Sequence, residues 1–253
     1  MPDGCAIVTG GGTGIGAAVA RRLAADGYAV AVLGRRPEPL EVVASEIGGL
    51  AVQANVGQPG DCDRAVAEAI ERFGGASVLV NNAGIGDAEW EDVLRINLSG
   101  AFYMARAALP HLVESRGSIV NVSSISGVLA GPGWAAYCTS KAGLIMLTRC
   151  LALDYGPQGV RVNAVCPGWV RTPMGDEDME ALGERRGADP DEAYDLTHRD
   201  VPLRRPARAE EIAAVVAFLA GPDASFVSGV ALPVDGGASV VDVTATAFAE
   251  PAP

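Results

Sequence analysis

The sequence TGGGTGIG at residues 9–16 decides the fold. It follows an apolar run of strand length, Cys5–Thr9, and leads into a helical pattern that extends to about Ala25. Glycines in such a turn let the backbone approach a pyrophosphate, which then lies on the positive N-terminus of the helix. Many tight strand–helix turns bind nothing, but the position after a first strand favours a dinucleotide site. The residues predicted to contact the cofactor here are Gly10, Gly12, Thr13, Gly14, Ile15 and Gly16.

Apolar runs of strand length alternate with helical patterns along the whole chain. The predicted strands are 5–9, 28–33, 50–54, 77–80, 118–122, 161–165 and 230–234. The predicted helices are 14–25, 40–47, 61–73, 90–109, 135–155 and 210–219. Strands that are apolar on both faces and alternate with helices are typical of parallel sheets covered on both sides. We therefore predict an α/β fold, a Rossmann-type, doubly wound, seven-stranded parallel sheet flanked by helices.

No linker or change of composition divides the chain, so we predict a single dinucleotide-binding and catalytic domain over residues 1–253. Residues 173–206 differ from the rest because they are polar, charged and weakly periodic. A long irregular excursion inside a compact domain is usually functional, and we interpret this one as a substrate lid. Residues 238–253 form a C-terminal tail, for which disorder and packing on a neighbouring subunit both remain open.

Charge and composition argue against several classes of partner. The formal net charge of −12 disfavours nucleic acid and anionic membranes, because both attract basic surfaces. The chain has no apolar run of about 18 residues that could cross a bilayer, and its N-terminus lacks the basic start of a signal peptide. The five cysteines show no metal-ligand spacing. We therefore expect reduced thiols and a cytoplasmic protein.

The chain contains 18 arginines and a single lysine, Lys141. Arginine cannot release its proton at working pH, whereas the pKa of a buried lysine can shift, so the lone lysine points to chemistry. Lys141 follows Tyr137 by one helical turn. A free phenol, with a pKa of about 10, is a poor base at neutral pH, and a nearby cation lowers that pKa. The pair therefore predicts proton transfer by Tyr137, with an idle surface Tyr–Lys pair as the alternative.

Several motifs occur in a fixed order along the chain. They are TGGGTGIG at 9–16, NNAG at 81–84, a serine thirteen residues before YxxxK at 137–141, and PG at 167–168. Together with VSGVALPVDGG at 227–237, this ordered set resembles the short-chain dehydrogenase/reductase family from about residue 5 to residue 237. Each motif is moderately specific, and the ordered set is highly specific. The resemblance implies a nicotinamide-dependent oxidoreductase that needs no metal.

The resemblance also implies four catalytic residues, Asn97, Ser124, Tyr137 and Lys141. Ser124 matches the serine that hydrogen-bonds the substrate oxygen, and Asn97 matches the helix asparagine that holds a proton-relay water. Tyr137 is then the acid and base, while Lys141 lowers its pKa and holds the ribose hydroxyls of the nicotinamide. Ser123 and Ser124 both end the same predicted strand, and either could be a simple strand-end residue.

The residues after the second strand indicate which nicotinamide cofactor is bound. NAD-specific folds usually place an acid there to hold the ribose 2′-hydroxyl, and that acid also repels a 2′-phosphate. Here Gly34 is followed by Arg35 and Arg36, two guanidiniums suited to a phosphate. We therefore favour NADP(H). NAD(H) remains possible, because ordinary surface arginines, or an arginine stacked on adenine, would fit the same pattern.

The resemblance assigns further cofactor contacts to three strand ends. Asn55 stands where the family commonly has an aspartate beside the adenine, and its amide oxygen keeps an acceptor there. The backbone of the NAG segment passes under the adenosine ribose, and the PGWVRT segment holds the carboxamide through Val170 and Thr172. The set at these strand ends is Asn55, Val56, Asn82, Ala83, Gly84, Pro167, Gly168, Val170 and Thr172, and the catalytic Tyr137 and Lys141 are predicted cofactor contacts as well.

The predicted reaction is hydride transfer between NADP(H), or NAD(H), and a secondary alcohol or its ketone. We expect the substrate pocket to include Ser126, Leu129, Trp134, Trp169 and Met174. Two tryptophans favour a cyclic or aromatic substrate, unless each merely packs. By resemblance we expect a homotetramer in which the helices at 90–109 and 135–155 meet their mates.

Two alternatives to this function remain. The first, within the same family, is a 3-oxoacyl thioester reductase, although the acidic chain offers little attraction to an acidic carrier. The second is a regulator that senses the dinucleotide without turnover, which has no need of four catalytic residues.

Overall fold

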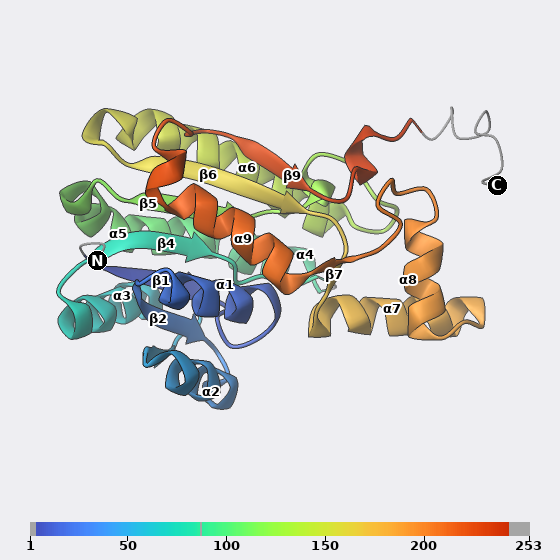
Figure 1. Cartoon of the computed structure of the whole chain (residues 1–253), viewed down its shortest axis with the longest axis horizontal. Coiled ribbons are helices and arrows are strands. Elements are labelled where there is room, and N and C mark those ends of the chain that lie inside the picture. The colour runs from blue at the N-terminus through green and yellow to red at the C-terminus, as the bar shows by residue number, and fades with distance from the viewer. Residues whose placement is uncertain (1–3, 87, 243–253) are drawn as a thin grey trace.

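A computed structural model describes residues 4–86 and 88–242 of the chain. Seven strands form one parallel sheet in the order β3-β2-β1-β4-β5-β6-β9 (Figure 1). The strands are β1 Cys5–Thr9, β2 Ala29–Gly34, β3 Leu50–Gln53, β4 Ala76–Asn81, β5 Ser118–Val122, β6 Arg161–Pro167 and β9 Ala231–Val234. The predicted doubly wound, seven-stranded sheet is therefore confirmed.

Helices cover both faces of this sheet (Figure 1). Alternate residues of β1 show why two layers are needed, because Ala6 and Val8 enter one buried cluster while Cys5 and Ile7 enter the other. The first face is covered by α1 Gly14–Ala25, α2 Pro37–Ile47 and α9 Ala209–Ala220. The second face is covered by α3 Pro59–Phe73, α5 Gly100–Ser115 and α6 Ala135–Tyr155. Among the described residues, no helix is both long enough and apolar enough to cross a membrane.

The strand order reverses between β1 and β4. From β1 the chain winds outward through β2 to β3, and from β4 it winds the other way through β5 to β6. Ligands of open parallel sheets bind at the carboxyl ends of the strands beside such a reversal. The motifs after β1, β4, β5 and β6 all lie at that edge.

The segment predicted as one helix at 90–109 consists of three parts. They are α4 Trp90–Leu94, a π-helical turn Arg95–Ser99, and α5, which runs past Pro110 to Ser115. A π-helical turn inserts an extra residue into a helix and is frequent at functional sites. Here it contains Asn97, one of the predicted catalytic residues.

The prediction of a long irregular excursion at 173–206 is wrong. The structure has two helices there, α7 Pro173–Arg186 and α8 Pro190–His198. Thr172 caps α7 by accepting a hydrogen bond from the backbone of Gly175 at 3.2 Å, and a capping box of Asp189 and Glu192 begins α8. The short strands β7 Val170–Arg171 and β8 Ala207–Arg208 pair where the segment leaves and rejoins the domain.

This helical pair, called the lid hairpin below, has a small core of its own. Met179, Ala193 and Tyr194 are buried in it, with Trp169 and Leu182 packed against them. So few buried positions produce almost no helical periodicity in the sequence, which explains the error. The last described residues include a 3₁₀ turn at Ala238–Val240, and most of the predicted tail, 243–253, lies outside the described residues.

Because Tyr194 is the largest buried side chain of the hairpin, Tyr194→Ala should open the hairpin without unfolding the sheet. We expect trypsin to cut after Arg185 or Arg186 at least about tenfold faster than in the wild type, with little change in the melting temperature of the sheet. Limited proteolysis and circular dichroism measure the two effects. Unchanged cleavage, or a sheet that melts together with the hairpin, would contradict this account.

Candidate active site

The glycine loop after β1 leaves the N-terminus of α1 open to an anion. Thr13 is the N-cap of α1, yet its side chain caps no backbone N–H, and the first turn contains no acidic side chain. Gly14 has a φ of +53°, and a Cβ added to it would lie 3.2 Å from the side chain of Thr172. The loop therefore fits a pyrophosphate on the helix N-terminus. Ile15 is partly buried against the core.

A clamp of hydrogen bonds ties this loop to the end of β4. The hydroxyl of Thr9 accepts from the backbone N–H groups of Asn82 and Ala83, both at 3.0 Å, and donates to the carbonyl of Val80 at 3.3 Å. The Asn82 side chain donates to the carbonyls of Thr9 at 2.9 Å and Gly10 at 3.3 Å. Asn82 is thus more than a turn residue. Thr9 was missed from the sequence, although a hydroxyl at the end of a buried strand was a signal.

Ser124 and Tyr137 come together at the end of β5, and Ser123 does not join them. The Ser123 hydroxyl is buried and donates to the carbonyl of Lys141 at 2.9 Å, which is a structural role. Ser124 accepts from the backbone of Ser126 at 3.1 Å, and its side chain hydrogen-bonds Tyr137 in the first turn of α6. The structure therefore separates the two serines that the sequence left open.

Lys141 is buried beneath Tyr137. Its Nζ donates to the carbonyl of Val122 at 3.0 Å and lies 5.5 Å from the centre of the Tyr137 ring. A Cβ added to Gly84 would lie 3.4 Å from this Nζ, so the predicted NAG segment borders the catalytic lysine. Burial lowers the pKa of Lys141 to about 8, and the Cys166 thiol opposes that shift.

Burial also raises the pKa of Tyr137 to about 12 in the protein chain, and the hydrogen bond with Ser124 only partly offsets it. Burial therefore outweighs any lowering of the phenol pKa by Lys141 in the protein chain, and that role of Lys141 stays a prediction. The ammonium is turned toward the carbonyl of Val122, and loss of water around the phenol is the larger effect.

Asn97 is locked in place by backbone groups. Its amide oxygen accepts from the N–H of Ile85 at 2.8 Å, and its amide nitrogen donates to the Ile85 carbonyl at 2.9 Å and to the Ser140 hydroxyl at 3.1 Å. Ser140 donates in turn to the carbonyl of Tyr137 at 2.7 Å. The π-helical turn thus connects the segment after β4 with the first turn of α6. The proton-relay role of Asn97 stays a prediction.

Arg35 and Arg36 follow β2, and Arg36 is the N-cap of α2. Within the described part of the chain, neither guanidinium takes part in any of the ion pairs, which involve nine other arginines. Two exposed cations without a protein counter-ion at this end of the sheet can receive a phosphate.

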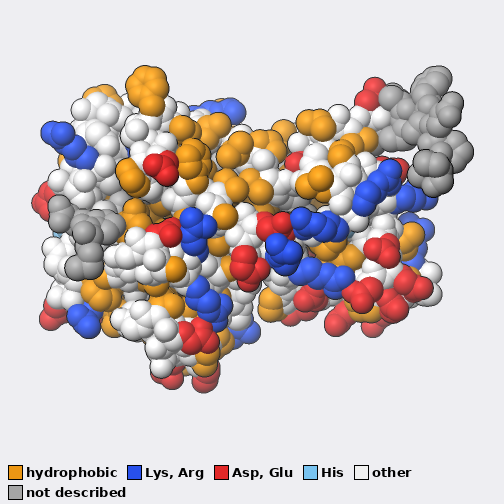
Figure 2. Space-filling view, viewed as in Figure 1, with side chains coloured by type: hydrophobic (Ala, Val, Ile, Leu, Met, Phe, Trp, Pro, Cys, Tyr) orange, Lys and Arg blue, Asp and Glu red, His pale blue; other side chains and the backbone are white. Residues whose placement is uncertain are grey.

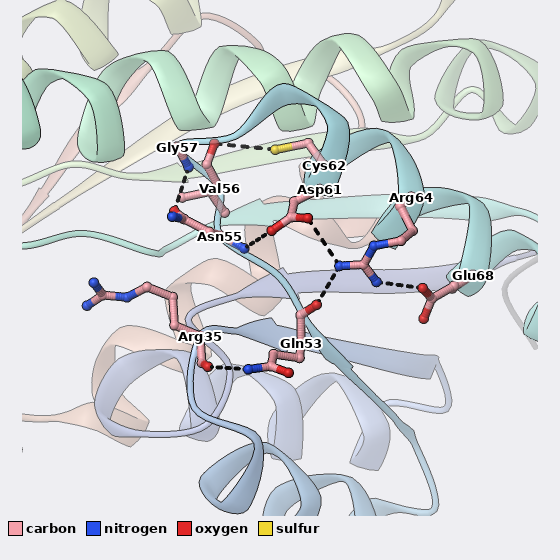
Figure 3. A network of polar contacts seen from close by, with 9 residues as sticks. All are labelled: Arg35, Gln53, Asn55, Val56, Gly57, Asp61, Cys62, Arg64 and Glu68. Atoms are coloured by element: carbon pink, nitrogen blue, oxygen red, sulfur yellow. Dashed lines mark hydrogen bonds and ion pairs between the residues drawn. The ribbon is translucent and has the colours of Figure 1, made fainter.

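Asn55 and Val56 lie in a tightly bonded turn between β3 and α3 (Figure 3). The amide oxygen of Asn55 accepts from the N–H of Gly57 at 3.0 Å, and the N–H of Asn55 donates to Asp61 at 2.9 Å. The carbonyl of Val56 accepts from the Cys62 thiol at 3.3 Å. The Asn55 amide oxygen, which is predicted to contact the adenine, therefore already accepts one hydrogen bond within the turn. Its second lone pair is left for a ligand.

The segment after β6 joins the site to the lid hairpin. Pro167 ends β6, and the N–H of Gly168 donates to the carbonyl of Val234 at 3.1 Å. The Thr172 hydroxyl donates to the carbonyl of Val170 at 3.3 Å while it caps α7. The carboxamide contacts of Val170 and Thr172 stay predictions. The Thr172 hydroxyl already has two protein partners.

Of the predicted substrate residues, the structure brings the tryptophans together. The rings of Trp134 and Trp169 form an edge-to-face pair with centroids 6.0 Å apart. Trp134, Leu129 and Met174 are all more than two-fifths exposed, and Ser126 is half-buried beside Ser124. The tryptophans therefore do pack on each other, and Trp134 directly precedes α6, three residues before Tyr137.

Comparisons with known proteins identify relatives of the chain. The family model described as enoyl-(acyl carrier protein) reductase matches residues 10–239. Protein MoaE of Klebsiella aerogenes is 44% identical over 96% of this chain and 98% of its own length. Meso-2,3-butanediol dehydrogenase of Serratia marcescens is 37% identical over 93% of this chain and 94% of its own length.

A solved structure has the same fold. A variant of actinorhodin polyketide ketoreductase, crystallised with NADPH, superimposes with a TM-score of 0.88 at 36% identity, over 93% of this chain and 97% of that one. Two of these proteins are named for their activity, one as a butanediol dehydrogenase and the other as a polyketide ketoreductase. The chain belongs to the short-chain dehydrogenase/reductase family and is an NAD(P)-dependent oxidoreductase acting on CH–OH groups.

Proposed function

We propose that the protein is an NADP(H)-dependent carbonyl reductase and alcohol dehydrogenase of cyclic or aromatic secondary alcohols, with Tyr137 as its acid and base. The observation that carries the proposal is the convergence of Ser124, Tyr137 and Lys141 beside the NAG segment, which Asn82 ties to the glycine loop. A bound nicotinamide supplies the hydride donor or acceptor. The open N-terminus of α1 and the unpaired Arg35 and Arg36 fit its pyrophosphate and 2′-phosphate.

The side chains of the site divide the proton chemistry between them. Tyr137, whose pKa burial raises to about 12, keeps its proton at neutral pH, can donate it to a carbonyl oxygen during reduction, and takes a proton back in the reverse reaction. Ser124 shares a hydrogen bond with Tyr137 and can hold the same oxygen. The Lys141 ammonium lies close enough to stabilise the phenolate left after donation. Asn97 keeps the first turn of α6 in register through Ser140.

The Trp134–Trp169 pair supports a cyclic or aromatic substrate. Trp134 is exposed just before α6, Trp169 packs against the core of the lid hairpin, and the paired rings offer apolar surface to a flat molecule. The thioester alternative draws on the family description, which names an acyl carrier protein. Against it, residues 173–200 contain ten Asp or Glu and three Arg, and Figure 2 shows acidic side chains along the lower edge of that end, below a row of basic ones. Acidic carriers would be repelled there.

We also propose a cytoplasmic homotetramer. An apolar groove of about 350 Å³ runs between α5 and α6, lined by residues such as Phe102, Leu109 and Leu151. Met146 and Leu153 expose further apolar surface on α6. Such a surface suits contact with a second copy, and sedimentation velocity distinguishes a tetramer from a monomer.

Tyr137→Phe tests the reaction. We expect kcat for NADPH-dependent reduction of a cyclic ketone to fall about 10²- to 10⁴-fold, because the proton donor is lost, while dinucleotide affinity changes far less, because the other predicted cofactor contacts remain. Absorbance at 340 nm follows turnover over a panel of cyclic, aromatic and open-chain ketones and 3-oxoacyl thioesters. Tyr155→Phe, at the far end of the same helix, is the matched control. Full activity in Tyr137→Phe would disprove the assignment, and binding without any turnover would favour the sensing alternative.

Lys141→Met should stabilise the protein at pH 7 while it abolishes activity. The folded pKa of about 8 lies below the ordinary 10.5, so a protonated lysine is costly in the folded state below pH 8. Between those pH values the unfolded chain binds more protons, so wild-type stability rises with pH. Allowing for the lost bond to Val122, we expect a gain of about 1–2 kcal/mol at pH 7 that shrinks toward pH 10. Denaturant unfolding across this range measures it, and a destabilised variant at pH 7 would refute the buried-charge argument.

Arg35→Asp tests the choice of cofactor. We expect the Kd of NADP⁺ to rise about 10- to 100-fold, because a charge-assisted bond to the 2′-phosphate is replaced by repulsion, with little change for NAD⁺. Fluorescence titration measures both constants. Arg72→Asp, on the exposed end of α3, controls for the added charge. Equal effects on both dinucleotides, or none, would leave NAD(H) as the cofactor.

A further inference from the structure

We propose that Gln53 is a positioning residue for cofactor selectivity, which holds Arg35 where it reads the 2′-position of the cofactor's adenosine ribose. The inference rests on the NADP(H) preference proposed above. Gln53 is exposed, carries no charge and takes no part in the reaction, but its side-chain nitrogen donates to the backbone carbonyl of Arg35 at 3.1 Å (Figure 3).

The position of Gln53 in the sheet explains why this bond matters. Gln53 and Gly34 are the last paired residues of β3 and β2, and the N–H of Ala54 donates to the carbonyl of Gly34 at 2.8 Å. Beyond that bond β2 leaves the sheet, and α2 begins at Pro37, which has no N–H to donate. The side chain of Gln53 therefore continues the ladder by one residue and fixes the peptide of Arg35.

Gln53 can fix the Arg35 peptide because Gln53 is itself held by a frame of hydrogen-bonded and ion-paired side chains on α3, namely Asp61, Arg64 and Glu68. Its own carbonyl accepts from Arg64 at 2.7 Å, and the guanidinium of Arg64 also pairs with Glu68 at 2.6 Å and Asp61 at 3.4 Å. Asp61 accepts from the backbone N–H of Asn55 at 2.9 Å. One frame on α3 therefore sets both Arg35 and Asn55, the residues predicted to read the ribose and the adenine.

The orientation of the Arg35 side chain agrees with this positioning role of Gln53. Figure 3 shows its side chain extending away from Gln53, so the carbonyl is anchored on one side and the guanidinium is free on the other. A guanidinium anchored through its backbone loses less freedom when it binds a phosphate, and this raises affinity for NADP⁺ alone. NAD⁺ has no phosphate at that position and should be indifferent to Gln53.

Two near-isosteric variants test the proposal. Gln53→Met removes the donor, and Gln53→Glu places an acceptor against the Arg35 carbonyl. We expect Gln53→Met to raise the Kd of NADP⁺ about fivefold, Gln53→Glu to raise it further, and both to leave the Kd of NAD⁺ within about twofold. Isothermal titration calorimetry measures these constants, and kcat at saturating NADPH should stay unchanged. Gln158→Met, which removes a comparable exposed side-chain bond of 3.5 Å to the Asp154 carbonyl, is the control.

A double-mutant cycle with Arg35→Ala separates the possible outcomes. If Gln53 acts through Arg35, Gln53→Met should have no further effect on NADP⁺ binding in the Arg35→Ala background. Equal losses for both dinucleotides, a fall in kcat, or an unchanged NADP⁺ constant would overturn the positioning role. If Arg35→Ala itself leaves NADP⁺ binding intact, the NADP(H) preference fails, and the role of Gln53 fails with it.

Discussion

The structure depends on the clamp between the ends of β1 and β4. A single hydroxyl, that of Thr9, joins the two strands at the point where the sheet changes its winding direction. Because both strands are buried, their last peptide groups could not find water, and the clamp satisfies them with protein partners. The glycine loop, the NAG segment and the N-terminus of α1 all take their positions from this junction.

The catalytic pair, Tyr137 and Lys141, differs from the clamp because its burial lowers the stability of the fold. Lys141 is buried and Tyr137 is half-buried, and the loss of water lowers the pKa of the lysine and raises that of the phenol, so that each neutral form is favoured. A phenol that keeps its proton and an ammonium that is easily discharged suit proton transfer better than they suit stability. The hydroxyls of the neighbouring Ser123 and Ser140 donate to the backbone carbonyls of Lys141 and Tyr137, and these bonds hold the two reactive residues in place.

Sequence reasoning identified the parts that depend on local pattern. The strands, the glycine loop and the Ser–Tyr–Lys set could be predicted because buried strands, tight turns and helical spacing each leave a periodic signal. The lid hairpin could not, because Met179 and Tyr194 are too few to produce one. The capping pair Asp189 and Glu192 is the sequence pattern that indicates the start of α8. Whether the pKa of Tyr137 rises or falls depends on its burial and on the direction of the Lys141 ammonium. Residue spacing predicts neither of these.

The π-helical turn at Arg95–Ser99 has a consequence for how the site can change. An α-helix rotates by about 100° per residue, so the extra residue in this turn offsets the face of α5 from that of α4 by the same amount. The offset lets α5 bury its apolar stripe against the sheet while Asn97 points at the segment after β4. A single deletion in this turn would swing Asn97 away from Ile85 or move α5 off the sheet. The sheet and the segment after β4 therefore fix the length of this turn together, and the segment cannot lose a residue.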